Sequence, residues 1–293
     1  MGDFASFHPI VLFVYYIIVL AFSMLTLHPV PIVVSMTGAF VFYAVTHKVR
    51  VTLSEAFFYL IVFILLSITN PLFVHNGETI LFFMNDHPIT LEAVFYGMAM
   101  AGMLIAVLYW CKCYNLVLTS DKFLYLFGKA IPKLSLVLSM ALRFIPLFKK
   151  HAEDIKRVQK TMGMYAGTGF VDKLLYSLRI FDGLVGWSLE NAIDTADSMK
   201  ARGYGLKGRS NFSIFRFEKK DGILLILIGI FAVIVLSGFL TGTYFFYYYP
   251  VTGRIINSTE LVIQTAALSG LMMIPAFLEI KERIKWKYLK SSI

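Results

Sequence analysis

The segment from residue 189 to residue 210 holds the side chains best suited to specific recognition. It reads as the end of an amphipathic helix that stops at Gly203 and continues as a basic, glycine-rich turn. Arg202, directly before that glycine, carries a planar guanidinium that can donate several directed hydrogen bonds to a carboxylate. Such a polar helix end, placed between strongly apolar segments, indicates the docking of a soluble partner.

A purely structural explanation of the same two residues stays open. Glycine at a helix end accepts the left-handed backbone conformation that closes the last turn. A cation there also suits the negative end of the helix dipole. Taken alone, Arg202 and Gly203 are therefore explained better by an ordinary helix end than by docking, and only the wider pattern favours docking.

The motifs that would give the chain a catalytic activity of its own are missing. Gly128-Lys129 is followed by Ala130 and lacks the preceding frame of a phosphate-binding loop. The sequence contains neither His-Glu-x-x-His nor Gly-x-Ser-x-Gly, and its apolar segments hold no clustered carboxylate pair. We therefore expect a protein that is not an enzyme, does not hydrolyse ATP itself and needs no cofactor.

The histidines and cysteines do not predict a metal site. Three of the six histidines stand directly before proline, in expected turns. Cys111 and Cys113 have no second pair that would complete a tetrahedral ligand set. We expect no bound metal.

The composition is that of a membrane protein. The chain is 58% hydrophobic, and its charged fraction of 15% compares with about 25% in a typical soluble domain. A net charge of +9 would also suit nucleic acid. In a membrane protein, cytoplasmic loops that face anionic lipid explain the basic residues better. The expected partner is thus the lipid bilayer, and no nucleic acid.

Six apolar segments predict an all-α integral membrane protein with about six transmembrane helices. Prolines after His28 separate the first two, so the first segment is interpreted as a retained helix and not as a signal peptide. Gly97 and Ala101, and the GxxxG spacing of Gly238 and Gly242, are typical of close helix packing. The segments are residues 10–27, 32–45, 53–68, 91–110, 222–239 and 261–278.

The distribution of Lys and Arg predicts the orientation. Residues 112–220 hold 19 of the 27 basic residues, whereas the loop at 70–88 holds none. By the positive-inside rule, both termini and the central region are cytoplasmic in a multi-pass protein of the cell membrane. The chain divides accordingly into transmembrane helices 1–4 (residues 1–111), a cytoplasmic region (112–220), and helices 5–6 with a basic tail (221–293).

Two long amphipathic helices are predicted inside the cytoplasmic region. The first runs from near Pro132 toward Gly163 and is kinked or interrupted at Pro146, and the second spans about residues 171–202. Each has one apolar face to bury, against the other helix, the membrane helices or the membrane surface. The apolar stripe of the second helix comprises Leu174, Leu178, Phe181, Val185, Leu189, Ile193 and Ala196.

The nine residues Asp-Ser-Met-Lys-Ala-Arg-Gly-Tyr-Gly at 197–205 resemble the Ala-Arg-Gly coupling motif of energy-coupling factor (ECF) transporters. That motif belongs to their transmembrane T component, in the family that includes the cobalt-transport permeases. Leu-Arg-Phe-Ile-Pro at 142–146 is similar to the same family. So is the order of parts: four apolar spans, two long cytoplasmic helices, and further spans.

The resemblance implies a coupling subunit with two kinds of partner. It would join two cytoplasmic ATP-binding-cassette (ABC) ATPase subunits or domains to a small substrate-binding membrane protein, the S component. ATP-driven motion would pass through the two long helices during uptake of a vitamin, a vitamin precursor or a metal ion. Ala201, Arg202 and Gly203 would form one ATPase-docking motif.

The first helix end departs from that motif. Gln159 and Gly163 fit it, but Met162 stands where the motif has arginine. We expect this degenerate end to dock by apolar packing, with charge supplied by Arg157 or Lys160.

A self-sufficient secondary transporter is the main alternative. It would need ionisable residues inside the spans, because coupling ions need partners there. The sequence shows Glu92 and Glu260 only near span ends. We therefore expect the chain alone to transport nothing.

Overall fold

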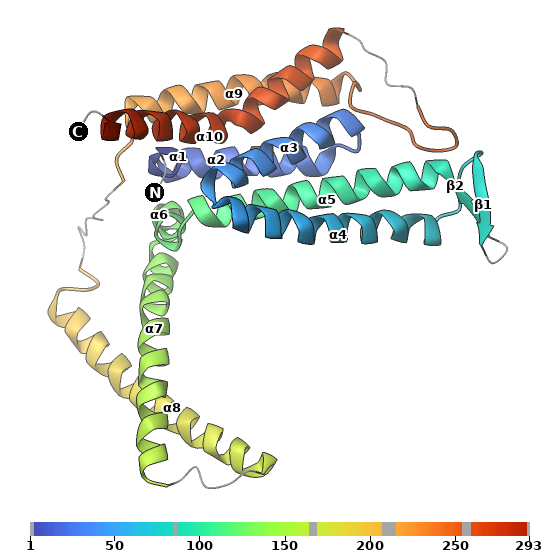
Figure 1. The fold of residues 1–293 in the computed structure, drawn as a ribbon. Coiled ribbons are helices and arrows are strands. Elements are labelled where there is room, and N and C mark those ends of the chain that lie inside the picture. The colour runs from blue at the N-terminus through green and yellow to red at the C-terminus, as the bar shows by residue number, and fades with distance from the viewer. Residues whose placement is uncertain (1–2, 85–86, 164–168, 207–214, 254–258, 292–293) are drawn as a thin grey trace. The chain divides into compact units, whose positions relative to one another are not determined.

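The computed structural model describes residues 3–84, 87–163, 169–206, 215–253 and 259–291 (Figure 1). The chain forms two compact units. The first consists of Met1–Phe123 with Phe215–Ile293, and the second of Leu124–Ile214. Each unit is described by itself.

Helices occupy all six apolar segments that the sequence indicates. In the described part of the chain, five of them are long and apolar enough to cross a membrane, and α2, with 17 residues, is a shorter sixth. The protein is therefore an α-helical membrane protein. After the short α1 (Asp3–Ser6), these helices are α2 (Pro9–Leu25), α3 (Pro29–Thr46), α4 (Val49–Phe73), α5 (Leu91–Val117), α9 (Lys219–Leu240) and α10 (Thr259–Ser291).

Several helices run further than their apolar segments, and α4 and α10 do so through a proline. α4 continues through Pro71 to Phe73, and α10 continues through Pro275 to Ser291. The residues expected to form a basic tail are thus largely helical. Hydropathy marks only the part of a helix that lies in hydrocarbon, so it misses a polar continuation.

Two of the His-Pro pairs start helices. His8 and His28 are the N-cap residues of α2 and α3, and each Nδ1 accepts the N–H of the second residue after it at 3.3 Å. Proline follows in the first helical turn, where its missing N–H has no intrahelical partner to lose. Burial lowers the pKa of His28 below its ordinary value of 6.5, which favours the neutral, accepting ring.

Helix α5 lies against α2, α3 and α4 in the first unit (Figure 1). Trp110 is fully buried there, and its indole N–H donates to the Ser35 hydroxyl at 3.1 Å. That hydroxyl is 2.7 Å from the hydroxyl of Ser23, so three helices share one polar chain. A Cβ at Gly97 would lie 2.6 Å from the Ser67 carbonyl oxygen, which confirms the predicted close packing at this glycine.

The GxxxG interpretation holds for one glycine only. A Cβ at Gly238 would lie 2.5 Å from the Gln264 side chain, so this glycine allows α9 and α10 to approach closely. Gly242 lies beyond the end of α9 and has φ +78°, so it forms a turn and packs no helix. The prediction for Gly242 was wrong because α9 ends at Leu240.

The base-free loop forms a short hairpin of β1 (Ile80–Met84) and β2 (His87–Thr90), with Phe82 opposite Ile89. The Glu92 carboxylate, buried at the start of α5, accepts from the backbone N–H and the hydroxyl of Thr79. This end of the unit also contains the segment after α9, where the Tyr248 hydroxyl donates to the Leu27 carbonyl at 2.7 Å.

At the opposite end of the unit, the N-terminal segment of residues 3–8 contacts both junctions with the second unit. The buried Lys122 ammonium donates to the carbonyls of Ala5 at 2.6 Å and Val117 at 2.8 Å. The buried Asp221 carboxylate accepts the N–H of His8 at 2.9 Å. Burial lowers the pKa of Lys122. The chain therefore leaves and re-enters the first unit beside the same short segment.

The second unit is built from α7 (Pro132–Thr161) and α8 (Phe170–Ala201), preceded by α6 (Ser120–Ala130), which begins in the first unit. The sequence predicted a kink or an interruption at Pro146, and the interruption was wrong, because α7 passes this proline as one helix. Proline removes a single i→i−4 bond, and on this half-exposed helix water can bond the carbonyl of Leu142 that it frees.

Candidate functional site

The end of α8 has the hydrogen bonds of a Schellman cap. Ala201 is the last helical residue, Arg202 is the C-cap, and Gly203 has φ +80°. The N–H of Gly203 donates to Lys200 O at 2.9 Å, and the N–H of Tyr204 donates to Met199 O at 3.0 Å. The helix-end explanation of Gly203 is thus correct as far as the backbone goes. Residues 207–210 of the basic turn lie outside the described residues.

The end of α7 matches that of α8 up to the glycine. Thr161 is its last helical residue, Met162 is the C-cap, and Gly163 follows with φ +70°. The N–H of Gly163 donates to Lys160 O at 3.2 Å. Met162 and Arg202 therefore hold equivalent positions, each directly before a glycine in the left-handed conformation.

Both C-cap side chains are available at the surface. Met162 is 65% exposed, and Ala201 and Arg202 are exposed as well. Gln159 is half-buried, and its Oε1 has no hydrogen-bond partner among the described residues. Arg157 and Lys160 are the two bases expected to supply charge beside Met162. Arg157 already pairs with an acidic residue, Asp154, at 3.6 Å.

The two helices cross well before either end. Figure 1 shows the crossing of α7 and α8. A Cβ at Gly183 of α8 would lie 3.2 Å from Ile155 Cδ1 of α7, and nearby the His151 and Trp187 rings stack with their centroids 4.4 Å apart. Met162 lies about 10 Å beyond this crossing and Arg202 about 28 Å beyond it, at 1.5 Å per residue. Going back along α7 from Lys156 to Ile155 and His151, the contacts go forward along α8 from Tyr176 to Gly183 and Trp187, so the helices cross antiparallel. Their ends therefore point apart and are at least about 28 Å from each other.

The apolar stripe of α8 takes no part in this crossing, which uses Gly183 and Trp187. Of the surfaces expected to cover the stripe, α7 is therefore not the one that does so. A face of this size on a membrane protein marks lipid or a protein partner. Six of its residues are between 39% and 64% exposed: Leu174, Leu178, Phe181, Val185, Leu189 and Ile193.

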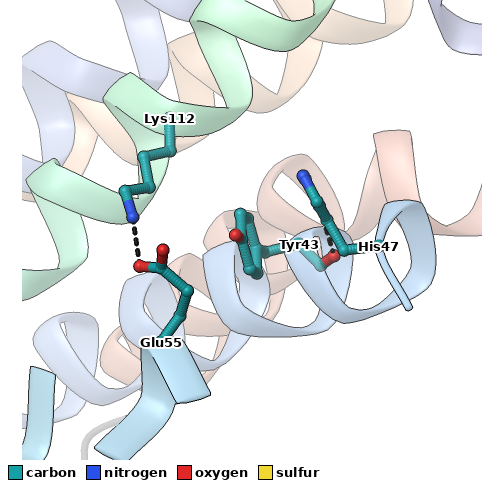
Figure 2. Close-up of polar contacts among 4 residues, drawn as sticks. All are labelled: Tyr43, His47, Glu55 and Lys112. Atoms are coloured by element: carbon teal, nitrogen blue, oxygen red, sulfur yellow. Dashed lines mark hydrogen bonds and ion pairs between the residues drawn. The ribbon is translucent and has the colours of Figure 1, made fainter. Parts of the chain in front are cut away.

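A charged pair within the first unit was missed by the sequence reasoning. Lys112 of α5 points toward Glu55 of α4 and forms an ion pair with it (Figure 2). The Lys112 ammonium also lies 5.0 Å from the ring centroid of Tyr59 and 5.9 Å from that of Tyr43. Glu55 falls inside the predicted third span, and this was the available signal that the span is not free of ionisable residues. Across the described ranges, no group of three or more His, Cys, Asp or Glu residues could hold a metal ion.

Similarity to known proteins extends over most of the chain. The profile of the cobalt transport protein family, CbiQ, matches residues 8–214. The energy-coupling factor transporter transmembrane protein EcfT of Listeria innocua is 36% identical over 112 residues, which cover 38% of this chain and 40% of that protein. The protein of the same name from Lactococcus lactis is 32% identical over 108 residues, covering 36% and 41%. These matches span about two fifths of the relatives' length.

Proposed function

Because the CbiQ profile matches more than half of its residues, the chain belongs to this transport family, and we propose that it couples ATPases to uptake as the T component of an ECF transporter. In this proposal two cytoplasmic ABC ATPase subunits or domains bind the ends of α7 and α8. A separate small membrane protein binds the substrate, which is a vitamin, a vitamin precursor or a metal ion. Membership of the transport family and the apolar membrane helices support this proposal.

The observation that carries the docking proposal is the pair of equivalent helix ends. Each exposes a C-cap side chain before a left-handed glycine, and the two are separated by at least about 28 Å. A single acceptor groove would require the ends to meet. Two separate ends instead suit two copies or two halves of one partner.

The chemistry of the two ends differs. Arg202 can make a bidentate, charge-assisted contact with a carboxylate of its ATPase. Met162 offers a flexible apolar side chain that fits an irregular groove. We propose that Lys160, which is exposed, supplies the nearby charge at that end more readily than Arg157, which pairs with Asp154.

The exposed stripe of α8 is our candidate surface for the substrate-binding membrane protein. A rigid helix that carries an ATPase at its end and an apolar partner along its face would pass a shift from one to the other, because packed elements deform little. On the positive-inside rule we propose that both termini, α7 and α8 lie in the cytoplasm.

The test is affinity purification of the mildly solubilised protein from its own cells, with mass spectrometry of what accompanies it. Arg202→Glu should lose ABC ATPase subunits that the wild type retains. Arg179→Glu is the matched control, because it is the same charge reversal at an exposed position of the same helix. Equal ATPase recovery with both variants, or none with the wild type, would reject docking through Arg202.

The Lys112–Glu55 pair is the one feature that favours a secondary transporter, because ionisable residues near membrane depth often serve ion coupling. Purified chain in proteoliposomes decides between the two functions. The coupling subunit alone should accumulate no substrate under an ion gradient, whereas gradient-driven uptake that is lost in Glu55→Gln would establish the alternative.

A further inference from the structure

Two apolar hollows of about 440 and 370 Å³ lie along α3 and α5 in the first unit. The second is walled by α4, and the first by Phe63 of α4 and four residues of the segment 246–253. Met36 and Phe63 line both, so the hollows are adjacent, and together they are called the furrow. Its floor is formed by α5, from Ala99 in the first hollow to Tyr109 in the second. The walls are almost wholly hydrocarbon and aromatic.

The furrow opens toward the bilayer. Helices α3 and α4 both pack on α5 much more than on each other. α4 is also the least buried of the candidate membrane spans, since only 11% of its most apolar 18-residue stretch is buried. Leu60, on the α4 wall of the furrow, is 54% exposed.

One end of the furrow meets a group of charges. Tyr59 and Tyr109 line its last part. Lys112 lies three residues beyond Tyr109 on α5, paired with Glu55 (Figure 2). Lys48 and Arg50, at the start of α4, are exposed at this same end. These three bases and one acid leave an excess of two positive charges.

We propose that the furrow binds one acyl chain of an anionic phospholipid, with its phosphate beside Lys48, Arg50 and Lys112. The apolar walls suit the hydrocarbon chain, and the excess positive charge suits the headgroup. Tyrosines lie between the two, at the depth where aromatic residues gather in membrane proteins.

The dimensions favour a lipid chain over a protein helix. From Phe95 to Tyr109 the furrow follows α5 for about 21 Å, more than the roughly 15 Å hydrocarbon depth of one leaflet. A single helical turn, about 10–12 Å wide and 5.4 Å tall, would by itself fill roughly 400–600 Å³. Each hollow therefore holds about one turn at most, whereas a thin, flexible chain can follow both.

The test uses photoactivatable lipids with the full-length chain in nanodiscs of phosphatidylcholine. One probe is phosphatidylglycerol with a diazirine in its acyl chain, and the other is phosphatidylcholine with the same acyl chain. We expect the phosphatidylglycerol probe to label peptides of α3 and α4 that face the furrow, and to do so more strongly than the phosphatidylcholine probe.

Matched variants separate the furrow from the general lipid surface. Leu60→Trp narrows the furrow, and Leu65→Trp makes the same change at a 65% exposed position of α4 outside it. In Leu60→Trp, labelling should fall about tenfold, because the loss of about two buried methylenes of the acyl chain weakens binding by that factor. In Leu65→Trp, labelling should stay unchanged. Thr37→Trp, on the α3 wall, repeats the test should Leu60→Trp misfold.

The headgroup claim has its own pair of variants. Lys48→Gln with Arg50→Gln should abolish the preference for phosphatidylglycerol, whereas Lys219→Gln with Lys220→Gln, at the start of α9, should keep it. Equal labelling of all helix faces, or labelling that Leu60→Trp and Thr37→Trp leave intact, would overturn the furrow site. Equal labelling by the two probes in the wild type would overturn the anionic headgroup. None of these results depends on an ATPase.

Discussion

Replacing Asp221 by asparagine tests how the N-terminal segment is held against the start of α9. The Asp221 carboxylate accepts two backbone N–H groups, from His8 at 2.9 Å and from Glu218 at 2.8 Å, and the residue is 2% exposed. Asparagine has nearly the same shape but presents one oxygen and an NH₂ group. One of the two amides must therefore lose its acceptor and face another donor.

The size of the effect follows from those two contacts. A hydrogen bond to a charged group is worth about 1.5–3 kcal/mol, and a buried donor left unsatisfied costs about 1–3 kcal/mol. We expect Asp221→Asn to destabilise the attachment of the segment by about 2–4 kcal/mol. Because about 1.4 kcal/mol is a factor of ten, the segment should open about 30-fold to 1,000-fold more often.

Hydrogen–deuterium exchange of the detergent-solubilised chain measures this opening. Exchange of the amides of residues 3–8 should accelerate by that factor, since the rate follows the population of the open state. Asp172→Asn, an exposed carboxylate in the first turn of α8, is the matched control and should leave these amides unchanged. If the His8 amide of a folded Asp221→Asn protein exchanges at the wild-type rate, the reasoning is refuted.

Four further predictions concern other positions. Lys122→Met removes the donor to two carbonyls, so it should destabilise the attachment of residues 3–8 by about 2–4 kcal/mol and speed exchange of their amides. Gly203→Ala should destabilise the last turn of α8 by about 1–2 kcal/mol, seen as faster local exchange, because its φ is +80°. Gly186→Ala, with open space around it, should instead stabilise the same helix by about 0.5–1 kcal/mol. His28→Asn keeps an N-cap acceptor but should flatten the pH dependence of thermal stability. The pKa of His28 is lowered in the fold, so wild-type stability is full above about 6.5 and falls as pH drops toward the folded pKa.

The sequence predicted the membrane helices because apolar runs report directly on burial in hydrocarbon. The resemblance to the coupling motif also predicted that Met162 and Arg202 hold equivalent positions, and both are C-cap residues directly before a glycine. The backbone at both ends bears this out, while the docking role of these residues stays a proposal.

What the sequence missed depends on contacts distant along the chain. Lys112 and Glu55 are 57 residues apart, so no local pattern shows that they pair. The stripe on α8 is a periodic signal, but periodicity shows that a face is apolar and not what covers it. His8 and His28 were treated as turn residues, and their N-cap role becomes visible only in the hydrogen bonds of the backbone.

The attachment of the N-terminal segment sets an order of events during synthesis. The N–H of His8 finds its acceptor 213 residues later, and the carbonyl of Ala5 finds Lys122 after 117. At about 5–20 residues per second, roughly 10–40 s pass between translation of His8 and translation of Asp221. Until α9 follows the second unit out of the ribosome, the segment has Lys122 and the aromatic neighbours of Phe4, which include Tyr15 and Phe42, but lacks its aspartate. The aspartate contact is thus a late step of maturation, formed only after the long helices of the second unit have been made.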